Sequence, residues 1–122
     1  MSLQLYHTTF SPPSRVVRII VKQLGINAEE KEVSLLTGEH MKPEFLSVSK
    51  LYFEFVDDGF ALWESRSIIT YLVDKLAPGN SIYPTELQAR AIVNRWLFWD
   101  AGIIFKMINR RFPSIRTPFG CY

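Results

Sequence analysis

The stretch GFALWESRSIITYL, residues 59–72, decides how the fold is understood. Its apolar run Phe60–Trp63 is typical of a strand, and amphipathic spacing then resumes at once, which predicts a helix over Ser65–Leu76. Between the two lies the polar segment Glu64–Arg66. By spacing alone, this junction fits a strand end and a helix cap with incidental charges.

Upstream of this junction the hydrophobic period switches several times. Asp58-Gly59 is a strong turn signal, so residues 51–64 are predicted to form a hairpin. Alternating apolar residues over Leu3–His7 predict a first strand, and a second is expected around Glu30–Leu35. Between them, helical spacing runs from a cap at Ser11, followed by two prolines in the first turn, to a stop at Gly25.

The element order predicts an α/β chain in two parts. A short helical turn over Pro43–Leu46 precedes the hairpin, so the first part reads strand, helix, strand, connection, hairpin, helix, as a thioredoxin-like domain requires. A linker then leads to a long amphipathic helix from about Thr85 to Phe112. We expect domains at residues 1–80 and 84–122, the second being the start of an all-helical domain.

Composition narrows the class of protein. The 122 residues are 48% apolar and 14% aromatic, ample for a packed core, and a net charge of +2 is too small to suggest nucleic acid. The single cysteine, Cys121, excludes an intramolecular disulfide and a cysteine-built zinc site, and we expect no metal site. No apolar run approaches the roughly 18 residues of a membrane span, and no signal peptide is recognised, so the expectation is a cytoplasmic protein without a membrane partner.

Several phrases, matching in the right order, carry a family resemblance. They are LYHTTFSPPSRVVRI, GEHMKPEFL, DDGFALWESRSIITYLVDK and SIYP. Together these resemble the N-terminal domain of insect glutathione transferases of the delta and epsilon classes, and the form SPPSR is most similar to epsilon. The resemblance covers nearly all of residues 1 to about 110. It implies glutathione bound as co-substrate on a thioredoxin-like domain, a helical domain for the electrophile, no other cofactor, and homodimers in the cytoplasm.

Ser11 matches the position of the family's catalytic serine. A free cysteine thiol has a pKa near 8.5, so lowering it by ~2 units requires the site to favour the thiolate by ~2.7 kcal/mol. A hydroxyl donor at a helix N-terminus can contribute to that, by donating a hydrogen bond rather than by taking the proton. Without the motif, Ser11 fits an ordinary helix cap, and Thr8 and Thr9 are the nearby alternative hydroxyls.

The remaining candidate residues bind glutathione in the resemblance. Glu64 and Ser65 match residues that hold the γ-glutamyl group, with Arg66 assisting near the dimer axis. The first helical turn after Ser65 has free N–H groups that suit a carboxylate, and Glu64 can accept from an ammonium. His40 matches a position near the glycyl carboxylate, but a lone histidine there equally fits a surface loop.

Two departures from the family bear on activity. The family's proline-containing segment is replaced by FLSVSKLYFEFVDD, where Phe53 stands at the proline position, so we expect another path for this glutathione loop. The chain also ends after the first helix of the helical domain, which would leave an apolar stripe exposed. Either a dimer partner covers this stripe, or the chain is a truncated product.

Two hypotheses follow. The first is a glutathione transferase that conjugates glutathione to small hydrophobic electrophiles, in detoxification, through Ser11. The alternative is a catalytically defective dimerisation or ligand-binding module of the same fold. A thioredoxin-type redox enzyme is disfavoured because it would need a cysteine near Ser11.

Overall fold

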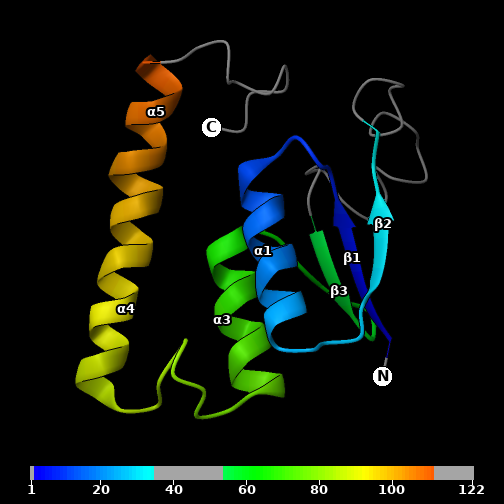
Figure 1. Ribbon diagram of the computed structural model, residues 1–122, viewed down its shortest axis with the longest axis horizontal. Helices are drawn as coiled ribbons and strands as arrows, with labels where there is room; N and C mark the ends of the chain where they lie inside the picture. The colour runs from blue at the N-terminus through cyan, green and yellow to red at the C-terminus, as the bar shows by residue number, and fades with distance from the viewer. Residues whose placement is uncertain (1, 35–53, 112–122) are drawn as a thin grey trace. The chain divides into compact units, whose positions relative to one another are not determined.

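The computed structural model describes residues 2–34 and 54–111 (Figure 1). The chain divides into two compact units, residues 1–77 and 78–122. In chain order, the elements are β1 Leu3–His7, α1 Pro12–Gln23, β2 Glu29–Glu32, β3 Glu54–Asp57, β4 Phe60–Leu62, α3 Ser65–Leu76, α4 Leu87–Trp99, the π-helical turn η2 Asp100–Ile104 and α5 Phe105–Arg111. The predicted turn over Pro43–Leu46 lies outside the described residues.

The first unit is built on a four-stranded mixed sheet in the order β2-β1-β3-β4. β1 pairs in parallel with β2, whereas β3 runs antiparallel to both β1 and β4. As a result β1, β2 and β4 all end at one edge of the sheet, and the two helices that follow β1 and β4 start from that edge.

α1 and α3 pack against each other on one face of the sheet (Figure 1). The alternation predicted for β1 is confirmed, because Leu3, Leu5 and His7 are buried while the residues between them are partly exposed. Leu5 and Phe55 of the sheet are fully buried beside the inner faces of both helices. The buried apolar cluster comprises Leu3, Leu5, Val17, Val21, Phe55, Ile68, Ile69 and Leu72.

The helix caps and turn residues explain where the helices and strands of the first unit begin and end. α1 begins after its cap at Ser11 and ends before Gly25, whose φ of 64° a helix cannot continue. Asp58 and Gly59 both have positive φ, as a two-residue hairpin turn requires. α3 has the predicted bounds. β2 is displaced from the predicted Glu30–Leu35, although the Val33 amide still donates to the His7 carbonyl at 2.7 Å.

The second unit contains one long helical segment whose form differs from the prediction. α4 begins at Leu87, not Thr85, because the Glu86 carboxylate accepts from the Gln88 and Ala89 amides at 2.9 and 2.7 Å. The α-helical hydrogen-bond pattern is then interrupted by η2, and no residue preference in the sequence predicted this π-helical turn. The preceding linker is held to α4 through Tyr83, whose hydroxyl donates to the Asn94 side-chain oxygen at 3.0 Å.

Aromatic residues of α4 remain exposed, including Phe98 at 77% and Trp96 at 54%. Trp96 and Trp99 pack edge to face, with ring centroids 5.5 Å apart. Within the described part of the chain, no helix is long and apolar enough to cross a membrane.

Candidate functional site

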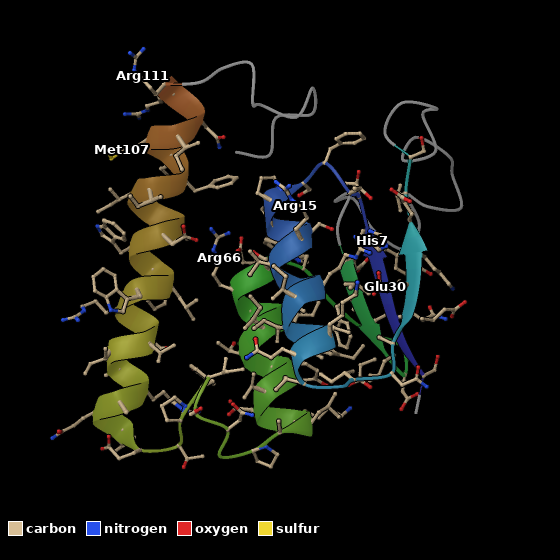
Figure 2. The ribbon with its side chains drawn as sticks, in the orientation of Figure 1. His7, Arg15, Glu30, Arg66, Met107 and Arg111 are labelled. Atoms are coloured by element: carbon tan, nitrogen blue, oxygen red, sulfur yellow. The ribbon has the colours of Figure 1, made fainter. Side chains whose placement is uncertain are left out.

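The N-termini of α1 and α3 lie at the same edge of the sheet, because each helix follows a strand that ends there. Arg15 in the first turn of α1 and Arg66 in the first turn of α3 show this common end of the helix pair (Figure 2). The structure therefore brings the predicted residue Ser11 to the same edge as the predicted residues Glu64, Ser65 and Arg66. His40 lies outside the described residues, as does Phe53.

Ser11 caps α1 with its side chain. Its Oγ accepts from the Ser14 amide at 3.4 Å, and its carbonyl accepts from the Arg15 amide at 3.0 Å. Pro12 and Pro13 have no N–H, so the first turn of α1 has few donors and the Ser14 amide already has a partner. What this helix end can offer a ligand is the Ser11 hydroxyl proton, which no group of the described residues accepts, together with the helix dipole.

The alternative hydroxyls are less suited to a ligand. Thr9 Oγ1 donates to Glu32 Oε1 at 2.5 Å, and this hydrogen bond lowers the pKa of the Glu32 carboxyl. Thr8 is buried, with 4% of its surface exposed. Among the three hydroxyls of this loop, Ser11 is thus the one that is both partly exposed and still able to donate.

The start of α3 has a different chemistry. Glu64 is its cap, with Oε1 accepting from the Arg66 amide at 3.4 Å and from Arg66 Nη1 at 3.2 Å. Arg66 Nη1 also donates to the buried Ser65 Oγ at 3.1 Å, so Ser65 can still donate its own proton. A carboxylate, a hydroxyl, a guanidinium and a helix N-terminus meet here, which suits a ligand group carrying both a carboxylate and an ammonium.

Glu64 also has an unusual backbone. Its φ of 75° and ψ of 110° lie outside the regions favoured by residues with a Cβ. Such conformations cost of order 1–3 kcal/mol and cluster at ligand sites. This conformation could not be predicted from the sequence, because glutamate has no preference for positive φ.

Behind the Ser11 loop lies a buried histidine that the sequence did not single out. His7 Nε2 is 3.4 Å from Glu30 Oε2, which also accepts from Arg18 Nε at 2.7 Å (Figure 2). His7 Nδ1 is buried, and no group in residues 2–34 or 54–111 forms a hydrogen bond with it. Burial, followed by the charge of Arg18, lowers the pKa of His7 below its ordinary 6.5, so the imidazole is neutral at pH 7. The only sign of this histidine in the sequence was a polar residue on the face of β1 that is buried.

A second polar cluster joins β3 to α3. The buried carboxylate of Asp57 accepts from the Tyr71 hydroxyl at 2.6 Å and from the Lys75 ammonium. These hydrogen bonds, that of Lys75 first, hold the pKa of Asp57 below its ordinary value and raise that of Lys75. No group of three or more potential metal ligands occurs among the described residues.

The first unit of the chain matches a known protein family. The sequence model of the family described as the glutathione S-transferase N-terminal domain matches residues 5–81. Glutathione S-transferase D7 of Drosophila melanogaster is 34% identical over 114 residues, covering 91% of this chain and 51% of the relative. The chain therefore spans about half the length of such relatives.

Solved structures show the same similarity. A diazinon-metabolizing glutathione S-transferase from the silkworm Bombyx mori superposes with a TM-score of 0.86 at 34% identity, over 97% of this chain and 58% of its own. Human glutathione transferase theta-2, in complex with glutathione and an unknown ligand, gives 0.82 at 37% identity, over 91% of this chain and 46% of its own. The predicted fold, a thioredoxin-like domain followed by a short helical portion, is confirmed.

Proposed function

Because this chain belongs to the glutathione S-transferase family, we propose that it binds glutathione across the N-termini of α1 and α3 and conjugates it to small hydrophobic electrophiles. The observation that carries the proposal is the placement of a free hydroxyl proton at one helix end and an ion-pair cluster at the other, on one edge of the sheet.

The spacing of the two helix ends suits a tripeptide. Axes of packed helices lie about 8–10 Å apart, and α1 contacts α3 directly. Three extended residues span at most about 10–11 Å. The thiol belongs to the central residue, but the γ-linkage adds two side-chain carbons to the path that leads to it, so glutathione with its γ-glutamyl end at Ser65 can present its thiol near the other helix end, at Ser11.

The chemistry at Ser11 follows from what α1 leaves available. Its hydroxyl already accepts the Ser14 amide, so its proton is directed away from that amide toward a ligand. Donation to the sulfur, assisted by the helix dipole, stabilises the thiolate over the thiol. The thiol proton leaves for solvent, and the sulfur lone pair forms the bond to the electrophilic carbon. The leaving group, where there is one, departs with the electron pair of its own bond.

The proposal also concerns the electrophile, the oligomeric state and the location of the whole protein. The diazinon-metabolizing relative supports a small hydrophobic electrophile and a part in detoxification. A homodimer and a cytoplasmic location are what the family resemblance implies, and the exposed aromatic residues of α4 are compatible with a partner surface.

The test compares Ser11→Ala and Ser65→Ala with the unaltered chain. Calorimetry measures glutathione affinity, the ultraviolet absorbance of the thiolate gives the pKa of bound glutathione, and a dinitrophenyl halide reports conjugation. Ser11→Ala should raise the thiol pKa toward 8.5 and slow conjugation at least tenfold, with affinity little changed. Ser65→Ala should weaken binding by about 1–3 kcal/mol, because a buried ligand charge loses its partner.

Ser67→Ala is the matched control, because it removes an exposed hydroxyl from the same turn of α3. A chain that neither binds glutathione nor lowers its thiol pKa would refute the proposal. Binding without conjugation would support the alternative of a catalytically defective module.

A further inference from the structure

The hydroxyl of Ser14 is fully buried and has no part in the function proposed above. Its Oγ accepts from the Thr8 amide at 3.1 Å, although Thr8 lies six residues upstream. At the same time the Ser14 amide donates to Ser11 Oγ at 3.4 Å. One residue thus holds both ends of the loop that precedes α1.

This arrangement is a displaced form of the capping box. In the usual box the third helical residue is glutamate or glutamine, and its long side chain reaches back to the amide of the cap residue. Serine at that position is too short, and the Ser11 amide instead donates to the Thr8 carbonyl at 3.1 Å. The hydroxyl of Ser14 is therefore available for the Thr8 amide, so both backbone groups of Thr8 are held.

The consequence for Ser11 is geometric. The turn from Thr8 to Ser11 is closed by one backbone bond and anchored by one bond to a buried hydroxyl. Because the two prolines that follow supply no amide, the Ser14 amide alone fixes the side chain of Ser11 from the first turn. The direction in which Ser11 presents its proton depends on where Ser14 lies.

We propose that Ser14 is a positioning residue for Ser11, acting through the Thr8 turn to aim the Ser11 hydroxyl at the glutathione sulfur. This inference rests on the proposed function of Ser11. Ser14 itself touches neither substrate nor reacting atoms, so its effect must pass through Ser11.

The experiment is a double-mutant cycle on the full chain with Ser14→Ala, Ser11→Ala and the double variant. Ser14→Ala should raise the pKa of bound glutathione and slow conjugation about three- to tenfold, the size expected when one neutral hydrogen bond is lost, with affinity unchanged. In the Ser11→Ala background it should have no further effect on either quantity. Val17→Ala, fully buried one turn along the same helix, controls for lost stability because it leaves every bond of the turn in place.

A second readout needs no glutathione. Ser14→Ala should reduce protection of the Thr8 amide from hydrogen exchange at least tenfold relative to the Leu5 amide in β1, and Val17→Ala should not. Unchanged Thr8 protection overturns the inference, as does an equal effect of Ser14→Ala with and without Ser11. If the unaltered chain leaves the thiol pKa of glutathione at its free value, the proposed function fails, and the exchange measurement alone then decides whether Ser14 holds the Thr8 turn that leads to Ser11.

Discussion

Replacing Glu64 with alanine and, separately, with glycine tests the backbone strain at the start of α3. Both variants lose the same carboxylate, with its bonds to the Arg66 amide at 3.4 Å and to Nη1 at 3.2 Å. They differ in the Cβ, which the observed φ of 75° disfavours and glycine lacks. The pair of variants therefore separates the strain from the loss of contacts.

The magnitudes follow from the geometry. Loss of the cap costs about 1 kcal/mol, and the ion pair, whose side chains are 29% and 17% exposed, adds at most about 1 kcal/mol. Glu64→Ala should therefore lose about 1–2 kcal/mol of unfolding free energy. Compared with alanine, glycine gains about 1–2 kcal/mol of unfolding free energy because positive φ does not strain it, and it loses about 0.5–1 kcal/mol because it has greater freedom in the unfolded chain. Glu64→Gly should be the more stable of the two by about 0.5–1 kcal/mol.

Urea unfolding followed by circular dichroism measures both variants. Asp74, exposed within the same helix, supplies the control pair, since there glycine should be the less stable residue by about 1 kcal/mol. The expected sign thus reverses between the two positions. Equal or lower stability of Glu64→Gly than of Glu64→Ala would show that the conformation at Glu64 stores no strain.

Three other perturbations address the first unit. Because the pKa of His7 is lowered in the folded chain, the unfolded chain binds more protons below about pH 6.5. The free energy of unfolding should therefore fall from about pH 7.5 to 5.5, and urea titrations should show a smaller fall for His7→Gln. Lys75→Met should destabilise the chain at pH 7, because the buried Asp57 carboxylate then has one donor fewer. Since the pKa of Asp57 is depressed, the difference in unfolding free energy between this variant and the unaltered chain should shrink as pH falls below about 3.8, which denaturation series at several pH values measure. Gly59→Ala should cost about 1–2 kcal/mol because the φ of 89° disfavours a side chain, although no atom of the described residues, its chain neighbours aside, lies within 4 Å of the added Cβ. Thermal unfolding should show a smaller loss for Gly59→Asn.

Elements with a repeated pattern were predictable from sequence. The helix Ser65–Leu76 and the turn at Asp58-Gly59 were predicted correctly because spacing and turn chemistry are local properties. The end of β2 was misplaced because pairing with β1 decides where a strand stops. η2 depends on hydrogen bonds within one turn of a helix, for which the apolar period has no distinct signature.

The candidate site was predictable in its members but not in its geometry. Ser11 and the Glu64–Arg66 segment were identified by resemblance, whereas the topology of the sheet was needed to place them at one edge. The hydrogen bond from the Thr8 amide to Ser14 could not be read from the sequence, because a serine within a helix has no preferred distant partner. The roles of Ser11, Glu64, Ser65, Arg66 and His40 stay predictions.

The π-helical turn at Asp100–Ile104 bears on how insertions and deletions are tolerated in the second unit. A π-turn takes up one more residue than an α-turn, so the side chains beyond it are rotated by about 100° relative to an uninterrupted helix. Trp96 and Met107 are eleven positions apart and would share one side of a regular α-helix. With the turn present they point about a quarter of a circle apart, and deleting a single residue within the turn would restore a regular α-helix while leaving the two sides in this same relation.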